Sequence, residues 1–430
     1  MKNALLLIVM IWFVGSGQLP ARANPPMPKS AGEAMTYYLP HVSASTWPGT
    51  SASLSIWVSV AEVNALPIAG EPGCESDSLC ERAWDTLVEK AHGPWDTPDL
   101  DDYEGAGHSN DTYAGALVAV RLNDVAMRQK TIDALMSVIG TEREALAVNG
   151  GKENGMLAIS RNLLRYVIAG DLLGLRADGD PNSPGTRWWD YLNYLWTAEL
   201  TDDEGDSGKT FSDEPKPSCA SNGCMMSAAS HTALAAYLGH TAMVEADWLQ
   251  LQRYLGNRSV GQELRFSSTG KNWYHDDSAK VGINPPGATC NGGYPADGVI
   301  PNDQGRGGEC PTDPATAPGY TQYPWEGLQG AYAQALILER QGYSVWDASH
   351  EALLRAVQYQ WYLQDRFGGE WYDDDRAAWV KHLANRQYGF RPVPYDASGG
   401  GRNMDFVQWT HPVPDTSTRL STPSPLSSHN

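Results

Sequence analysis

Apolar residues recur three and four positions apart over most of the chain between residues 51 and 384, which is the spacing of one face of an α-helix. Glycine, proline and short polar turns separate these segments. The pattern predicts a series of helices, over residues 51–66, 80–91, 113–122, 125–139, 155–175, 188–200, 225–238, 242–255, 325–341, 346–364 and 375–384. No convincing series of alternating apolar and polar residues indicates strands.

Short turns join successive helices, which is typical of an all-α fold built from helical hairpins. We predict an α/α toroid, an incomplete barrel of such hairpins, in a single domain over residues 51–412 with long functional loops. An α-solenoid is the alternative, but the sequence shows no repeat of fixed period. The helix over 225–238 is rich in Ala, Ser and Thr, and we expect it in the inner layer because small residues let helices approach closely.

The two ends of the chain differ from its middle. A basic start, an apolar run and the small residues Ala21 and Ala23 predict a signal peptide over 1–23. Residues 24–50 predict an irregular arm, and 413–430, rich in Ser, Thr and Pro, predict a disordered tail. No later run approaches the length of about 18 apolar residues that spans a membrane. We therefore expect an exported, soluble protein, in the periplasm or the medium.

Six cysteines follow the predicted signal peptide, an even number in a chain expected to be exported. Their grouping predicts three local disulfides, Cys74–Cys80, Cys219–Cys224 and Cys290–Cys310. Free thiols or a metal site are the alternative, but no closely spaced cysteine pair with matching histidines supports it. Bridges over such short loops serve mainly to shape the loops.

Composition restricts the partners. The net charge of −20 argues against nucleic acid and anionic membranes. Sixteen Trp and twenty Tyr against six Phe favour carbohydrate binding, because amphipathic rings stack on sugar faces. An anionic polysaccharide fits if the cleft gathers positive charge. We find no cofactor motif and expect no cofactor, no metal in the active site and a monomer, while a structural Ca²⁺ in the acidic loops 201–206 or 373–375 stays open.

The candidate chemistry lies in the stretch 298–342. Arg306 stands among three glycines, and Tyr320 and Tyr323 precede a helix that Pro324 opens. An arginine on such a loop can hold a carboxylate through two parallel hydrogen bonds. A tyrosine at the entrance of the helix can transfer a proton.

Four segments in shared order resemble the alginate-lyase-type polysaccharide lyases, an α/α-barrel family, and most closely the glucuronan and alginate lyases of polysaccharide lyase family 38. They are S-N-G-C-M-M-S-A-A-S-H-T-A-L-A-A-Y-L-G (221–239), V-I-P-N-D-Q-G-R-G-G (299–308), G-Y-T-Q-Y-P-W-E-G-L-Q (319–329) and G-R-N-M-D-F-V-Q-W-T-H (401–411). The resemblance covers about residues 100–412. It implies β-elimination at a (1→4)-linked uronic acid: a tyrosine protonates the departing O4, an arginine and an asparagine hold the carboxylate, and a histidine supports proton abstraction.

By position, the resemblance assigns Arg306 to the carboxylate and Tyr320 to catalysis. An insertion, E-C-P-T-D-P-A-T-A-P, departs from the family pattern between them. Related alginate lyases have adjacent histidine and asparagine residues where this chain has Asn222, so we expect His231 with either Asn222 or Asn162 instead. Further residues expected to line the cleft are Tyr323, Trp325, His108, Arg265, Trp273 and Tyr388. A structural role is the alternative for each of these residues.

The proposed elimination has clear chemical requirements. The C5 proton of a uronate is acidic only if its carboxylate is neutralised, which Arg306, an asparagine and a histidine would do. A phenol with a pKa of about 10 is a poor base unless cations favour the phenolate. In mannuronate and glucuronate, H5 and O4 lie on the same side of the ring, so one tyrosine can serve both. These two sugars differ at C2, so this set of residues does not separate them.

Two other functions stay open. A glycoside hydrolase on an α/α barrel would use a carboxylic acid and a carboxylate, and Glu326, Glu370 and Asp373 are candidates. A non-catalytic exported carbohydrate-binding protein would share the aromatic residues and the disulfides. A lyase leaves a C4–C5 double bond that absorbs ultraviolet light, whereas a hydrolase leaves a saturated product.

Overall fold

The structure is a computed structural model. It describes residues 55–103, 107–147, 154–201, 209–267, 271, 273, 280–290, 293–368, 371, 374–390 and 401–413, without the side chains of 374–378. The predicted signal peptide, the N-terminal arm and the tail beyond residue 413 lie outside these residues. Thr201 aside, so do the side chains of the acidic loops 201–206 and 373–375.

The fold is mostly helical, which confirms the all-α prediction. The helices are α2 (Val60–Ala65), α3 (Leu79–His92), α4 (Gly107–Leu122), α5 (Val125–Val138), α6 (Gly155–Leu172), α7 (Pro184–Thr197), α8 (Asn222–Leu238), α9 (Thr241–Tyr254), α10 (Pro301–Gly305), α11 (Tyr323–Arg340), α12 (Ala348–Phe367), α13 (Asp374–Tyr388) and α14 (Val407–Thr410). Strand β1 (Thr289–Cys290) pairs antiparallel with β2 (Tyr294–Pro295). No helix of the described residues is long and apolar enough to cross a membrane.

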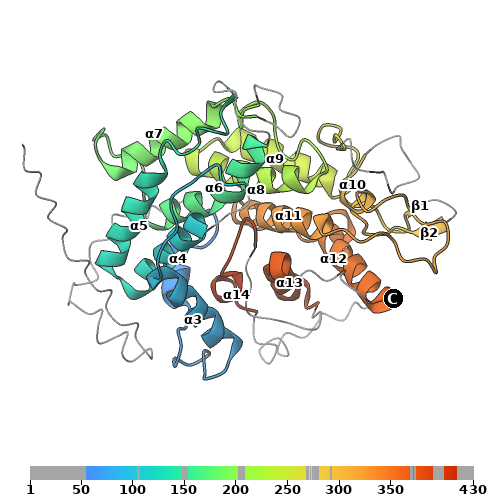
Figure 1. The fold of residues 1–430 in the computed structure, drawn as a ribbon, viewed down its shortest axis with the longest axis horizontal. Helices are drawn as coiled ribbons and strands as arrows, with labels where there is room; N and C mark the ends of the chain where they lie inside the picture. Colours follow the sequence, from blue (N-terminus) through green and yellow to red (C-terminus); the bar gives the residue numbers. More distant parts are fainter. Residues whose placement is uncertain are drawn as a thin grey trace, which may run out of the picture.

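Five helices contact one another in chain order and form an inner row. In this row α4 contacts α6, α6 contacts α8, α8 contacts α11, and α11 contacts α13. The intervening helices α5, α7, α9 and α12 each pack against members of the row. In Figure 1, α5, α7 and α9 follow the outer edge of the molecule, and α4, α6 and α8 lie on their inner side. The chain therefore alternates between two layers.

Helix α8 lies in the middle of the row and is buried over nearly its whole length. Gly330 of α11 approaches the α8 backbone so closely that no side chain would fit there. Asn222 contacts Glu326 near the first turn of both helices, and Thr232 contacts Gln334 farther along, so α8 and α11 run in the same direction. The prediction that this small-residue helix is an inner one is confirmed.

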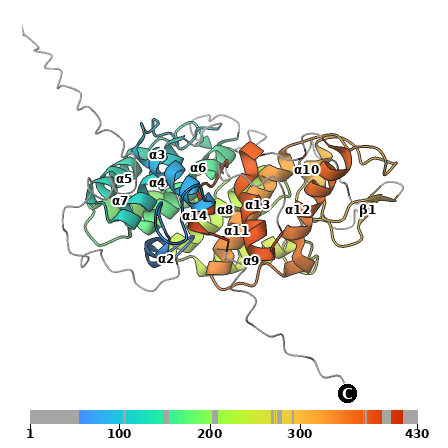
Figure 2. The same cartoon turned by 90° about the horizontal axis from the view of Figure 1, so that it is seen from below.

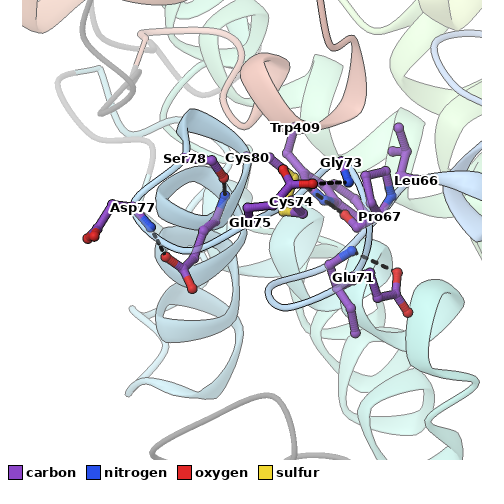
Figure 3. The surroundings of a disulfide bond; sticks show 12 residues. Leu66, Pro67, Glu71, Gly73, Cys74, Glu75, Asp77, Ser78, Cys80 and Trp409 are labelled. Atoms are coloured by element: carbon purple, nitrogen blue, oxygen red, sulfur yellow. Dashed lines mark hydrogen bonds between the residues drawn. A yellow bond between two sulfur atoms is a disulfide. The ribbon is translucent and has the colours of Figure 1, made fainter.

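Helix α14 joins the two ends of the described chain, because it contacts both α13 and α3. Trp409 of α14 donates from its indole N–H to the Pro67 carbonyl at 2.9 Å, and Figure 3 shows this residue beside the Cys74–Cys80 disulfide. In Figure 2, α14 lies between α4 and α13. Since α3 also contacts α4, helix contacts run without a break from α4 along the inner row to α13, α14, α3 and back.

Some elements differ from the sequence-based ranges, and local capping accounts for two of the differences. Of the helix predicted over 51–66, the described residues 55–66 form only α2, because Ser59 and Glu62 form a reciprocal capping box that sets its start. Helix α7 begins at Pro184, earlier than predicted, behind a serine N-cap. Residues 107–110, predicted as loop, form the first turn of α4. The short helices α10 and α14 are not predicted by the apolar pattern.

Residues 258–320, predicted as one long irregular segment, build a second small core against α12. Trp273 from this segment belongs to the same apolar cluster as Leu363 of α12. The Cys290–Cys310 disulfide is also part of it. All three predicted disulfides are present, namely Cys74–Cys80, Cys219–Cys224 and Cys290–Cys310. The second core fixes the loop that carries the candidate arginine relative to α12.

Candidate active site

Arg306 and Tyr320 start from neighbouring points of the backbone, despite the insertion 309–318 between them. Arg306 follows directly on the short helix α10 as its C-cap. Gly307 and Gly319 lie so close that a Cβ on either would overlap the carbonyl group of the other. These glycines therefore serve a close backbone approach. They bring the segments of the predicted carboxylate arginine and the predicted catalytic tyrosine together.

The guanidinium of Arg306 is held from two sides. Its central carbon lies 3.4 Å from the centre of the Tyr323 ring, in a cation–π contact. Its Nη1 donates a 3.2 Å hydrogen bond to Asn222 Oδ1 at the start of α8. Among the described residues the guanidinium makes no other hydrogen bond, which leaves N–H groups for an anionic ligand.

A buried carboxylate anchors Asn222. Glu326, in the first turn of α11, has 2% of its surface exposed. Its Oε2 accepts from Asn222 Nδ2 at 2.7 Å and lies 3.6 Å from Arg161 Nη2. Its Oε1 lies 3.4 Å from Arg402 Nε. Because a buried charge needs partners, Glu326 ties together side chains from segments far apart in the sequence.

Counted over the described residues, this cluster holds more arginine than carboxylate side chains, in an acidic protein. Three arginines, Arg161, Arg306 and Arg402, gather around Asn222 and the carboxylate of Glu326. Burial raises the pKa of Asp303 on α10 to about 7, although a side-chain hydrogen bond and the charge of Arg306 lower it. This carboxyl therefore carries only part of a negative charge near neutral pH. The excess of guanidinium groups favours an anionic ligand, in a chain with a net charge of −20.

Two solvent-exposed tyrosines lie on segments that contact the arginines or their neighbours in the chain. Tyr320 is 41% exposed, and its ring meets that of Trp371 edge-on with centroids 5.7 Å apart. Tyr103 is 40% exposed. Arg161 donates to the Tyr103 carbonyl at 2.6 Å, and its guanidinium carbon lies 4.7 Å from the centre of the Tyr103 ring. Amphipathic rings beside guanidinium groups suit a sugar acid.

Asn162 has a structural role. Its Nδ2 donates to the Asp102 carbonyl at 3.0 Å and to two other backbone carbonyls. Its Oδ1 accepts from Ser109 Oγ at 3.2 Å. The side chain is buried, and these bonds hold the loop that carries Tyr103 against α6. Of the two candidate asparagines, Asn222 is the one that meets the candidate arginine.

The structure does not bring His231 to this cluster. His231 follows Asn222 by nine positions in α8, which is about 13 Å along the axis and half a turn around it. Its Nδ1 lies 2.8 Å from Asp247 Oδ2 on α9. Its ring packs on Trp196, with centroids 4.9 Å apart. His231 therefore belongs to a buried polar contact on the opposite face of α8.

Two further candidates have partners of their own. His108 is buried, its Nδ1 lies 2.8 Å from the Tyr166 hydroxyl, and burial lowers its pKa. It immediately precedes Ser109, whose hydroxyl donates to Asn162. Arg265 is an exposed surface residue that pairs with Glu214 at 3.0 Å. Neither has a contact with the Glu326 cluster among the described residues.

The remaining predicted cleft residues lie in the core or support it. Trp273 and Trp325 have no exposed surface, and their indole N–H groups donate to backbone carbonyls at 2.8 and 2.5 Å. The Tyr388 hydroxyl donates a 2.9 Å hydrogen bond to the Trp346 carbonyl. The structure places these side chains in packing positions, and only Tyr323 of the predicted aromatic lining contacts Arg306.

Sequence reasoning does not predict Arg161, Arg402 or Tyr103 as site residues, and it names Glu326 only for hydrolysis. Two of these residues lie in segments that could have marked them as site residues: Arg402 in G-R-N-M-D-F-V-Q-W-T-H and Glu326 in G-Y-T-Q-Y-P-W-E-G-L-Q. Both segments carry the family resemblance. No local pattern marks Arg161 or Tyr103.

Comparison with known proteins gave no match to a family model, to a curated protein or to a solved structure. Within the part of the chain that the structure describes, no three His, Cys, Asp or Glu side chains are arranged to hold a metal ion. The function is therefore inferred from the geometry and charge of the site, together with the sequence resemblance.

Proposed function

We propose that this chain is an exported polysaccharide lyase with an α/α-toroid fold that cleaves (1→4)-linked uronic acid polymers by β-elimination. The observation that carries the proposal is the Arg306 guanidinium, which Tyr323 and Asn222 hold while N–H groups remain for a carboxylate. Guanidinium groups gathered in a chain of net charge −20 support an anionic substrate. The unbroken circuit of helix contacts supports the toroid.

In the proposed reaction, Arg306 binds the C6 carboxylate of a uronate through parallel hydrogen bonds. Asn222 accepts from Arg306 and donates to Glu326, so it acts as a positioning residue for the guanidinium. Neutralising the carboxylate stabilises the enolate that forms when C5 loses its proton. The site is held before substrate arrives, so little reorganisation accompanies the reaction.

Tyr320 is the proposed base and acid. Its phenolate takes the C5 proton, the C4–O4 bond breaks, and the phenol returns the proton to the departing O4, which leaves a C4–C5 double bond. One tyrosine on one face suits mannuronate or glucuronate, whereas guluronate, the C5 epimer, needs groups on both faces. His231 takes no part in this mechanism, because it faces the other side of α8.

Hydrolysis is less well supported by the site. A glycosidase acid must reach the glycosidic oxygen. Glu326 is buried and engaged by Asn222, Arg161 and Arg402, so it does not offer a free carboxyl to a polymer. The other two candidates for hydrolysis, residues 370 and 373, lie outside the described residues.

The test is to incubate the purified protein separately with polymannuronate, polyguluronate and glucuronan, and to follow ultraviolet absorbance and reducing ends in the same samples. The proposal expects both signals to rise together on polymannuronate or glucuronan. Reducing ends without absorbance would indicate a hydrolase. Absorbance on polyguluronate alone would contradict the single-tyrosine mechanism. No product on any polymer, with binding retained, would indicate a carbohydrate-binding protein.

A further inference from the structure

The side of α12 that faces away from the second core carries an aromatic cavity of about 370 Å³. Its lining residues are Gln358, Trp361, Tyr362, Asp365, Arg366 and Phe390. The volume falls within the range of small-molecule sites, about 300–1,000 Å³. Three aromatic rings and both signs of charge thus meet in one depression.

The helix spacing explains how this cavity forms. Trp361 and Tyr362 lie about one turn after Gln358, and a further turn leads to Asp365. These side chains therefore share one side of α12. Leu363 lies on the other side and is fully buried in the second core. Trp361 and Tyr362 are only half-buried, so part of each ring is open to a ligand.

A direct contact links the cavity to the loop between the two catalytic candidates. Arg366 Nη2 donates to the Pro314 carbonyl at 3.0 Å. Pro314 belongs to the insertion 309–318, which separates Arg306 from Tyr320. The insertion that departs from the family pattern therefore extends from the candidate active site to this face of α12.

A chain of aromatic residues makes a second link. The Trp361 ring meets the Trp325 ring edge-on at 6.4 Å between centroids. Trp325 donates its indole N–H to the Trp371 carbonyl at 2.5 Å, and the Trp371 ring meets Tyr320 at 5.7 Å. Two ring contacts and one hydrogen bond thus separate the cavity from the proposed catalytic tyrosine. Trp325 is fully buried, so this link couples the cavity to Tyr320 through the core, and the surface connection between them is the insertion 309–318, whose Pro314 carbonyl accepts from Arg366.

We infer that this cavity, here called the α12 subsite, binds a further uronate unit of the polymer that is cleaved at Tyr320. The inference rests on the proposed function. Trp361 offers a flat apolar face to the C–H side of a pyranose ring. The exposed Arg366 can pair with the carboxylate of that unit, which favours a uronate over a neutral sugar. The carbonyl and carboxylate oxygens of Gln358 and Asp365 can accept from its hydroxyls.

The subsite predicts a dependence on substrate length, because only a chain that occupies both Tyr320 and the α12 subsite gains the added contact. In Trp361→Ala we expect KM for the long polymer to rise about tenfold, while kcat/KM for a uronate trisaccharide stays within about twofold of wild type. Trp361→Phe keeps a ring and should restore most of the polymer KM. Tyr194→Ala removes an exposed aromatic on α7 and should change neither value. Equal losses on polymer and trisaccharide, or no loss at all, would overturn the inference.

A binding measurement separates this inference from the lyase proposal. Each variant is run through native gels that contain polymannuronate or glucuronan, where binding slows migration and turnover is not required. We expect wild type and Trp361→Phe to be retarded more than Trp361→Ala. That result without ultraviolet-absorbing product would refute the lyase proposal and keep the subsite. No retardation of wild type, or the same retardation in Trp361→Ala, would overturn the subsite.

Discussion

Replacing Glu326 by glutamine should destabilise the protein by about 3 kcal/mol. The substitution keeps the size of the side chain but removes the charge that faces Arg161 at 3.6 Å and Arg402 at 3.4 Å. The Arg161 side chain is 5% exposed, so water cannot replace the lost partner. Breaking a buried ion pair by removing one partner costs about 3–5 kcal/mol. Because the glutamine oxygen still accepts hydrogen bonds, we expect the lower end of this range.

The loss is measured by urea unfolding at pH 7, followed by tryptophan fluorescence with the disulfides intact. The matched control is Glu62→Gln. Glu62 pairs with Arg340 at 2.8 Å, but 51% of its side chain is exposed, and glutamine preserves the capping box, so we expect a loss below about 1 kcal/mol. Equal losses in the two variants, or a loss below about 1 kcal/mol in Glu326→Gln, would refute the reasoning that arginines converge on a buried carboxylate.

Two further predictions follow from named contacts. Asn162→Ala leaves buried carbonyls without a donor and should cost about 1–3 kcal/mol in urea unfolding while the folded variant keeps its rate of product formation. Asn222→Ala also loses a buried bond, to Glu326, but should in addition lower the rate of product formation. A lowered rate in Asn162→Ala, or an unchanged rate in Asn222→Ala, would contradict the assignment of the two asparagines. Burial lowers the pKa of His382 to about 4, below the value of about 6.5 in an unfolded chain. Between pH 7 and 5 the His382 imidazole therefore stays neutral in the folded protein, while the same side chain takes up a proton in the unfolded chain. The free energy of unfolding should fall by about 2 kcal/mol as the pH drops from 7 to 5. The free energy of unfolding of His382→Gln should fall by about 2 kcal/mol less than that of wild type over the same pH range. An identical pH dependence in both proteins would refute this.

Features set by neighbours in sequence were predictable. Helix starts depend on local caps: the start of α5 was predicted behind Asp124, whose carboxylate accepts from the N–H groups of residues 126 and 127, whereas the caps that begin α2 and α7 were overlooked. The disulfides join cysteines close together in the chain. Arg306 and Tyr320 lie in one stretch, so a single segment carries both candidates.

Features that depend on packing between distant segments were not predictable. Arg161 reaches Glu326 from a distant segment before it and Arg402 from one after it, and no local pattern marks such a meeting. Helix α8 is buried on nearly all sides, so its apolar residues form no stripe that shows which side faces the site. The spacing of nine residues puts Asn222 and His231 on opposite sides of a helix, but the sequence does not show which of the two sides faces the site.

The most direct test of the account is the ultraviolet absorbance of products from polymannuronate or glucuronan, measured for wild type, Tyr320→Phe and Arg306→Lys, with polymer binding followed in native gels. We predict that Tyr320→Phe binds the polymer like wild type but loses turnover by about a hundredfold or more, because it lacks the proton-transferring hydroxyl. Arg306→Lys should lose both binding and turnover, because lysine cannot form the paired hydrogen bonds. Wild-type turnover in Tyr320→Phe, or wild-type binding and turnover in Arg306→Lys, would contradict β-elimination at this site.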